Sequence, residues 1–343
     1  MNTPLEPFVE AVSHPEAPPD LKRVLWVEPD SYVRESLNEF IHNFCNTQQL
    51  QLRWYSVGSL EEAWQVASQL QHPIDVVLIE PDFALEFLQP WLQALRERYP
   101  ELRVALFTQR SVDDYLTVCN QLAIPHVLLK SIPFSFQEFQ AALKRLCLPE
   151  TTLAIEQLLP EPISESIEFT IENTDDIMLV FSSLNELLQH RLSCEVAAEV
   201  CTPLLEGLTN SVYHAIKADA GEDKYLKGSV IDKLEDAETV QVTFMETENY
   251  VAVTIRDQGG SLELNQVMYL LARNISGEGI FDETGRGLFL MYTLMDAFFI
   301  TVVPQQQTHV TLVKNKNRSL EIPSTASPYD VTLPNRPITF YQV

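Results

Sequence analysis

The stretch Asp282–Asp296, DETGRGLFLMYTLMD, places two glycines one residue apart directly before an apolar run. The apolar residues recur every three or four positions, so the stretch predicts a helix that begins at the Gly-x-Gly pair. Glycines at the start of a helix leave its first backbone N–H groups uncovered. These groups lie at the positive end of the helix dipole, so they can bind a phosphate. A tight turn is the competing interpretation, and the rest of the chain has to decide between them.

Composition favours a soluble protein of two or three domains. The chain has 343 residues and 45% hydrophobic residues, which is ordinary for a globular protein. Its five cysteines show no CxxC spacing, which indicates reduced thiols in the cytoplasm. No apolar run is long enough to span a membrane, and the first residues lack the order of a secretion signal.

The formal net charge of −25 argues against a nucleic-acid partner, because such a chain repels phosphate backbones at long range. Solubility is the simplest reason for the excess acid. A bound nucleotide would have to be held by local backbone donors and Mg²⁺ against this field.

The first half of the chain predicts an α/β domain. Residues 1–20 hold five prolines and no periodicity, which indicates a disordered lead. From residue 21 to 148, five apolar strand-like runs alternate with five helical patterns. This order is typical of a doubly wound parallel sheet, in which ligands bind at the C-terminal ends of the strands.

Polar residues stand at those strand ends and resemble a known pattern. They are Glu28, Asp30, Glu80, Thr108 and Lys130. Their order is similar to the acid pair, phosphoacceptor, Thr and Lys of the receiver domain of response regulators. The resemblance implies a flavodoxin-like fold and a phosphorylation pocket over about 21–148.

The sequence departs from the receiver pattern at the decisive positions. Pro29 stands in the second acid slot, and Glu80 replaces the phosphoaccepting Asp. Because Glu is one methylene longer, its carboxylate is misplaced for in-line attack, although it can stand where a phosphoryl charge would stand. A retained scaffold for docking or dimerising is therefore one interpretation, and a residual Mg²⁺ or phosphate switch is the other. Asp82 lies past the strand end and is not expected to substitute.

The boundaries of the second half follow from composition and periodicity. We expect a linker at 149–164, a second domain at 165–316 and a C-terminal tail at 317–343. The charged insert 217–238 is either a solvated loop or a docking excursion. The proline-bearing tail either packs along a sheet edge or binds a partner.

A polar motif in this second domain suggests a site. In EGLTNSVYH, Glu206, Asn210 and His214 are spaced i, i+4 and i+8, so on a helix they share one face. An Asn oxygen can bind Mg²⁺, and a Glu can take a proton from a hydroxyl. Alone, the motif would indicate no more than a solvated polar stripe.

A second motif ends a predicted strand. Asp257 is followed by Gln258 and two glycines, Gly259 and Gly260. A carboxylate in this position can accept a hydrogen bond from an exocyclic amine, and glycine lets a flat ring approach the backbone.

The three motifs in this order resemble one ATPase domain. It is the GHKL (Bergerat) type, an α/β two-layer sandwich shared by gyrase, histidine kinases and MutL. The domain is most similar to the anti-sigma-factor serine kinases, since EGLTNSVYH matches their Glu-x-x-x-Asn-x-x-x-His box and TGRGLFLMYTLMDAF matches their last box.

The resemblance implies ATP and Mg²⁺ as ligands. Asn210 would hold Mg²⁺, Glu206 would be the general base, and Asp257 with Gly259 would select adenine. The phosphates would lie against Thr284, Gly285, Arg286 and Gly287, with Thr284 alternatively a helix cap. His214 is expected to be structural. Ser261 replaces an expected glycine, which alters the adenine pocket.

Function follows from the same resemblance. It implies a homodimeric protein serine/threonine kinase that sequesters a target such as a sigma factor and phosphorylates a STAS-domain antagonist. A histidine kinase is rejected, because His190 ends a single helix and no two-helix dimerisation unit precedes the domain. A non-catalytic, nucleotide-tuned binding scaffold is the alternative, and Glu206 discriminates, because a pure binder needs no base.

Overall fold

A computed structural model provides the structure of the protein. It describes residues 21–47, 52–110, 112–130, 139, 142–143, 146–147, 159, 161–218, 221–275, 286–317 and 338–342. The predicted lead at 1–20 lies outside these residues, as do most of the predicted linker and tail.

The N-terminal domain alternates strands and helices as the sequence predicts, and most of the predicted fifth helix, at 135–148, lies outside the described residues. Its elements are β1 (Lys22–Val27), α1 (Ser31–Thr47), β2 (Leu52–Val57), α2 (Leu60–Gln69), β3 (Val76–Ile79), α3 (Leu85–Arg98), β4 (Arg103–Thr108), α4 (Val112–Leu122) and β5 (His126–Leu129). The strands are all parallel and lie in the order β2-β1-β3-β4-β5. This is the flavodoxin-like order, so the predicted doubly wound sheet is confirmed.

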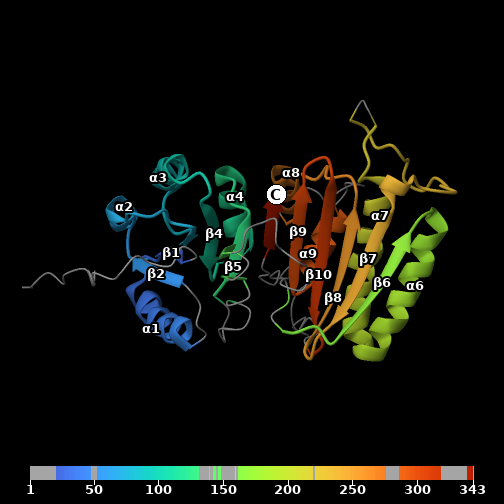
Figure 1. The fold of residues 1–343 in the computed structure, drawn as a ribbon, viewed down its shortest axis with the longest axis horizontal. Helices are drawn as coiled ribbons and strands as arrows, with labels where there is room; N and C mark the ends of the chain where they lie inside the picture. Colours follow the sequence, from blue (N-terminus) through green and yellow to red (C-terminus); the bar gives the residue numbers. More distant parts are fainter. Residues whose placement is uncertain are drawn as a thin grey trace, which may run out of the picture.

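Alternation along β1 shows why both faces of this sheet are covered. Val24 and Trp26 pack toward Ile41 of α1, whereas Leu25 and Val27 join the cluster that holds α2, α3 and α4. Successive side chains of a strand point to opposite faces, so the four consecutive apolar residues of β1 need a helix layer on each side of the sheet. Figure 1 shows the two layers around the strands.

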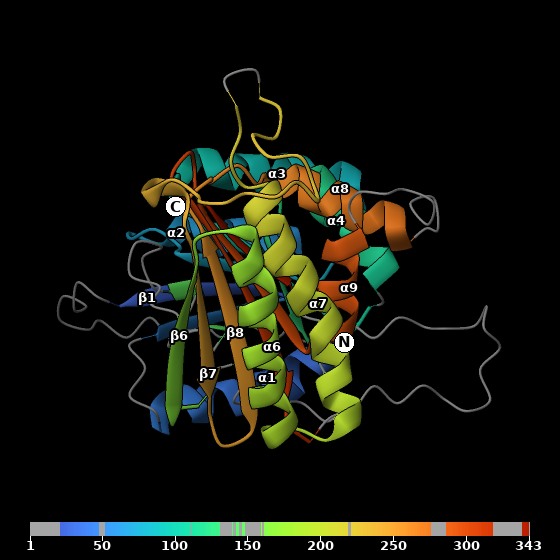
Figure 2. The same ribbon diagram turned by 90° about the vertical axis from the view of Figure 1, so that its right-hand side faces the viewer.

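The C-terminal domain is built on an antiparallel sheet. Its elements are β6 (Glu165–Ile171), α6 (Thr174–Arg191), α7 (Cys194–Tyr213), the short 3-10 helix η3 (Asp236–Glu238), β7 (Val240–Glu246), β8 (Tyr250–Asp257), α8 (Leu264–Ile275), α9 (Arg286–Leu294), β9 (Ala297–Val303), β10 (Gln307–Asn315) and β11 (Ile338–Gln342). Strands β9, β10, β8, β7 and β6 pair antiparallel in that order. The helices pack against the sheet through one shared cluster, and Figure 2 shows α6, α7 and α9 on one side of the strands.

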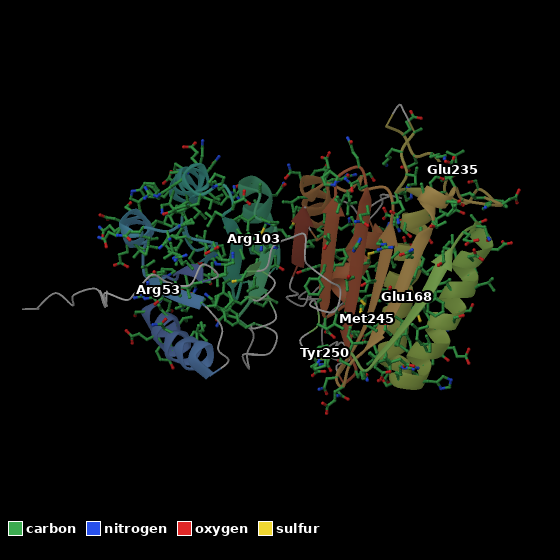
Figure 3. All side chains as sticks on the ribbon, in the orientation of Figure 1. Arg53, Arg103, Glu168, Glu235, Met245 and Tyr250 are labelled. Atoms are coloured by element: carbon green, nitrogen blue, oxygen red, sulfur yellow. The ribbon has the colours of Figure 1, made fainter. Side chains whose placement is uncertain are left out.

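Charged side chains line the far edge of this domain. Glu168 on the edge strand β6 and Glu235 in the insert are both exposed (Figure 3).

None of the described helices is long and apolar enough to cross a membrane.

Strand β11, from the C-terminal tail, joins the two domains. It pairs parallel with β9 over five residues and antiparallel with β5 at Val127 and His126. The result is a single sheet of 11 strands. Of the two roles that the sequence leaves open for the tail, the described residues 338–342 take the first, because they fill the space between two sheet edges.

One hydrophobic core also runs through both domains. A single cluster of buried residues includes Leu116 and Cys119 of α4 as well as Met268 of α8 and Met291 of α9. The two domains therefore bury part of their apolar surface against each other, which favours a fixed arrangement over a hinge.

A buried lysine fixes the C-terminal end of α9. Lys314 of β10 is fully buried, and its Nζ lies 2.5 Å from Oε2 of Glu199 on α7 and 3.9 Å from Oδ2 of Asp296. It also donates to the carbonyl oxygen of Leu294, the last residue of α9, at 2.9 Å. A cation at this position complements the negative end of the helix dipole.

We expect Lys314→Met to lower the free energy of unfolding by about 3–5 kcal/mol, because it leaves two carboxylates without their buried partner. Urea unfolding at pH 7 measures this loss. Lys22→Met is the control, since Lys22 pairs with Asp75 at 3.0 Å but is 39% exposed, and should lose less than about 1 kcal/mol. Equal losses in the two variants would contradict this account of the buried charge.

Candidate functional site

Helix α7 packs closely against the sheet at Gly207. A Cβ on Gly207 would lie only 2.6 Å from Cδ1 of Ile255 on β8. Glu206 and Asn210, one turn apart on this helix, are half-buried. The close packing of α7 against β8 fixes the positions of the Glu206 and Asn210 side chains.

The N-terminal end of α9 lies directly against those two side chains. A Cβ on Gly287 would be 2.9 Å from Oε2 of Glu206 and 3.1 Å from Nδ2 of Asn210. Gly287 is buried and is the second residue of α9. The structure thus brings together Glu206, Asn210 and Gly287, which the sequence places in two separate motifs.

This contact defines a place for an anion and a cation. The first N–H groups of a helix have no partner within the helix, and they carry the positive end of its dipole. Asn210 brings an amide, which offers oxygen to a metal ion, and Glu206 brings a carboxylate. Arg286, the first residue of α9, is exposed. Thr284 and Gly285 lie outside the described residues.

Asp257 lies at the C-terminal end of β8 and is only 7% exposed. Its Oδ1 accepts a hydrogen bond from the backbone N–H of Gly259 at 2.9 Å. It pairs in register with Thr308 of β10, which is itself buried. Burial raises the pKa of Asp257 to about 6, although the hydrogen bonds from Gly259 and Thr308 oppose the rise.

The glycines after Asp257 let two backbones touch. A Cβ on Gly259 would lie 1.9 Å from the carbonyl oxygen of Ala215, which follows α7. Gly260 has a φ of +56°, in the left-handed region that favours glycine. Ser261, which replaces the expected third glycine, donates its hydroxyl to the same Ala215 oxygen at 3.0 Å. The substitution therefore ties the loop to the end of α7.

A pocket of about 280 Å³ lies beside this loop. Its walls come from Gln258–Ser261, from Ile216 and Lys217 after α7, and from Gln305 in the β9–β10 turn. Asp257 directly precedes this wall of backbone, so a ring entering here would meet bare peptide groups.

His214 is held by the insert. Its Nδ1 lies 2.6 Å from Oδ2 of Asp223, and Lys217 donates to Oδ1 of the same carboxylate at 2.5 Å. Burial alone would raise the pKa of Asp223, but the hydrogen bonds from Lys217 and His214 hold it below its usual value. The start of the insert is thus tied to the end of α7, an arrangement that suits a structural histidine.

The receiver-like pocket brings four of its five predicted residues together, and all four are buried. Lys130 donates to carboxylate oxygens of both Glu28 and Glu80, the latter at 2.6 Å. Thr108 donates its hydroxyl to Oε1 of Glu80 at 2.8 Å. Burial raises the pKa of Glu80, and Lys130 and Thr108 counteract this. The side chains at these strand ends therefore bind one another.

The fifth residue, Asp30, points elsewhere. Its Oδ1 accepts hydrogen bonds from the backbone N–H groups of Tyr32 and Val33, at 2.8 and 3.1 Å, so it caps α1. Asp82, the rejected substitute acceptor, forms an ion pair with Arg110. His190 is 73% exposed and lies 4.0 Å from Glu186 on the same helix.

The second half of the chain matches a known protein family. Residues 167–314 match the family model described as the histidine kinase-like ATPase domain. The C-terminal domain is a histidine kinase-like ATPase domain. The domain implies ATP binding, and the matched range contains Glu206, Asn210, Asp257 and Gly287.

Solved structures similar to the chain include receiver proteins. Chemotaxis response regulator CheY4 of Vibrio cholerae is 16% identical, covers 37% of this chain and 98% of its own, and gives a TM-score of 0.30. The signal receiver domain of an HD domain-containing protein from Pseudomonas fluorescens Pf-5 is 17% identical, with 36% and 93% covered and a TM-score of 0.29. Response regulator TrrA of Thermotoga maritima is 23% identical, with 36% and 98% covered and a TM-score of 0.28. No curated protein matches the chain.

Sequence reasoning misses Thr308 as a member of the site, and it names Gly260 without assigning it a role. Thr308 lies at the start of β10, and its place opposite Asp257 in the sheet shows that it belongs to the site. Gly260 lies next to Gly259, but only its positive φ shows that it is required.

The raised pKa of Asp257 predicts a pH effect on stability. The folded state holds this proton more tightly than the unfolded state, so this group's contribution falls as pH rises from about 4 to about 6 and stays low above that. We expect the stability of Asp257→Asn relative to wild type to rise by about 1.5 kcal/mol between pH 5 and pH 8.

Urea unfolding of both proteins at the two pH values measures the difference. Glu161→Gln is the control. Burial alone would raise the pKa of Glu161, but hydrogen bonds from Asn249 and Thr247 hold it below its usual value. Its contribution is therefore lost only at more acidic pH, and the effect of this substitution should be nearly the same at pH 5 and pH 8. A pH-independent difference for Asp257→Asn would contradict the buried, proton-retaining carboxyl.

Proposed function

We propose that the chain is an ATP-dependent protein serine/threonine kinase that acts as a partner switch in signal transduction. One observation carries the proposal. The carboxylate of Glu206 and the amide of Asn210 meet the N-terminal end of α9 at Gly287. A base, a metal ligand and an anion site at one point are what phosphoryl transfer to a hydroxyl requires.

The residues present fit ATP and Mg²⁺. Asn210 would hold the metal ion through its amide oxygen, and the first turn of α9 would bind phosphate oxygens through its N–H groups. The missing side chain at Gly287 lets the first turn of α9 approach the two polar groups of α7 closely. Bound ATP with Mg²⁺ would supply the phosphoryl group.

Asp257 would select the base. With a pKa of about 6, its carboxylate is mostly ionised at neutral pH and can accept a hydrogen bond from an exocyclic amine. Gly259 and Gly260 present backbone rather than side chains beside it, in the wall of the 280 Å³ pocket. Both features favour a flat, amine-bearing ring.

Glu206 would take the proton from the attacking hydroxyl of a partner's Ser or Thr. The side chain is half-buried, so it remains within reach of a docked protein. By the resemblance described above, the partner would be a STAS-domain antagonist, the sequestered target would be a sigma factor, and the kinase would act as a homodimer in the cytoplasm.

A non-catalytic scaffold is the second candidate, and one observation favours it for the N-terminal domain. Lys130 forms ion pairs with both Glu28 and Glu80 inside the receiver-like pocket. A domain closed in this way serves as a rigid support more readily than as a phosphorylated switch. Glu206 still separates the two candidates for the chain as a whole, because only a kinase uses it.

Thiophosphate transfer tests the kinase. The purified chain, Mg²⁺ and ATPγS are added to a cytoplasmic extract of the source cells, and thiophosphorylated peptides are identified by mass spectrometry. We expect label on a Ser or Thr of a STAS-domain protein. Glu206→Gln should reduce the transfer at least about 100-fold, the size of a lost general base, while ATP affinity stays near that of wild type.

Glu195→Gln is the matched control, since Glu195 is an exposed glutamate in the first turn of the same helix and should leave transfer unchanged. Label on a histidine, or full transfer by Glu206→Gln, would contradict the proposal.

A further inference from the structure

Helix α9 is held at three points, and one of them comes from the other domain. Its N-terminal end lies against Glu206 and Asn210, and its C-terminal carbonyl at Leu294 accepts a hydrogen bond from Lys314. Between these ends, the hydroxyl of Tyr292 lies 2.6 Å from the hydroxyl of Tyr115. Tyr115 belongs to α4 of the receiver-like domain.

The tyrosine pair is buried and spans a long stretch of chain. Both side chains are 0% exposed, and the two residues are 177 positions apart. A buried hydroxyl needs a partner, because leaving one unpaired in an apolar core is unfavourable. A purely apolar contact would be served by phenylalanine, so the two hydroxyls add direction and register to this contact.

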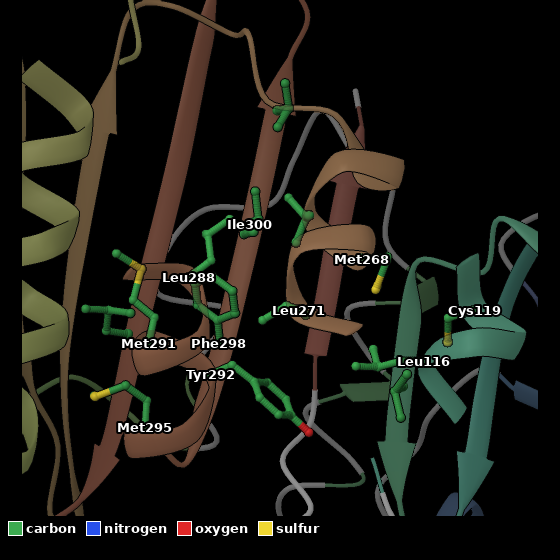
Figure 4. Close-up of a cluster of buried hydrophobic side chains, with 14 of the residues drawn as sticks. Leu116, Cys119, Met268, Leu271, Leu288, Met291, Tyr292, Met295, Phe298 and Ile300 are labelled. Carbon is green, nitrogen blue, oxygen red and sulfur yellow. The ribbon is translucent and has the colours of Figure 1, made fainter. Parts of the chain in front are cut away.

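The surroundings of the pair make the contact rigid. Leu116 and Cys119 of α4 lie in the same buried cluster as Met268 and Leu271 of α8. Figure 4 shows Tyr292 extending from α9 toward the side of α4, near Leu116. Helix α8 precedes residues 276–285 in the chain and α9 follows them, and α4 contacts both helices.

The path from this contact to the anion site is short. Tyr292 stands five residues after Gly287 on α9, which is about 7.5 Å along a helix axis. A helix of this length moves as a unit. Any shift of Tyr292 relative to α4 therefore moves the first turn of α9 relative to Glu206 and Asn210.

We propose that Tyr115 is a positioning residue for the nucleotide site, and that the receiver-like domain forms part of the support of α9 through the Tyr115–Tyr292 pair. This inference rests on the proposed nucleotide-binding function. It gives the receiver-like domain a definite role, because that domain then sets the position of the helix end that faces the phosphates.

Calorimetric titration of the full chain with ATP and with adenosine, both with Mg²⁺, tests this role. Adenosine has no phosphate, so it reports on the ring pocket but not on α9. We expect Tyr115→Phe and Tyr292→Phe each to weaken ATP binding about three- to tenfold, the effect of one buried hydrogen bond. Adenosine affinity should change less than about twofold.

The matched control is Tyr99→Phe. The Tyr99 hydroxyl is also buried in the receiver-like domain and donates to the carbonyl oxygen of Ala67 at 2.7 Å. This variant loses that hydrogen bond and the one that the Tyr99 hydroxyl accepts from Nε of Arg98 at 3.0 Å. It should therefore lower the unfolding temperature at least as much as Tyr115→Phe and keep the wild-type ratio of ATP to adenosine affinity.

The double variant Tyr115→Phe with Tyr292→Phe adds an independent measurement. It removes both hydroxyls of the pair together, so its ATP affinity should be closer to wild type than the product of the two single effects.

The positioning role would be overturned if Tyr115→Phe kept the wild-type ratio of ATP to adenosine affinity, or if the double variant lost ATP affinity by the full product of the two single effects. Either result could occur while the wild-type chain still binds ATP. No binding of ATP by the wild-type chain would remove the proposed function together with this role.

Discussion

The close approach of α7 and α9 is the constraint on which the rest of the site depends. Gly207 lets α7 settle onto β8, and Gly287 lets the end of α9 settle onto the polar face of α7. A methyl group at Gly207 would meet the end of the Ile255 side chain, and one at Gly287 would meet the polar ends of Glu206 and Asn210. The two glycines thus let a carboxylate, an amide and a helix N-terminus lie close together.

The same helix explains why the two domains form one body. Lys314 holds the C-terminal end of α9, and Tyr115 meets Tyr292 near its middle. Strand β11 then closes the sheet between β5 and β9. In the N-terminal domain, Glu28, Glu80, Thr108 and Lys130 meet at the strand ends, where Lys130 pairs with both glutamates. These four side chains are buried and form part of the interior of the domain.

Much of this structure is predictable from the sequence, for physical reasons that differ between elements. The parallel sheet follows from apolar strands alternating with helical periodicity, and the Glu206–Asn210 face follows from a spacing of four. Strand β9 escapes prediction, because its apolar run directly follows the helical one and lacks a turn signal. The role of β11 stays open at the level of sequence, since its pairing depends on two edges that are distant along the chain. The receiver pattern assigns Asp30 to the pocket, yet its carboxylate caps α1. The sequence does not decide between these two positions, because the side chain's direction depends on the path of the backbone.

Calorimetric titration of the intact chain with ATP, with and without Mg²⁺, tests most directly whether α7 and α9 together form a nucleotide site. We predict Mg²⁺-dependent binding by wild type and its loss in Asn210→Ala. The matched control is Asn185→Ala on α6, which removes another half-buried asparagine and should leave binding intact. Binding that ignores Mg²⁺ and the Asn210 substitution, or no binding at all, would contradict such a site.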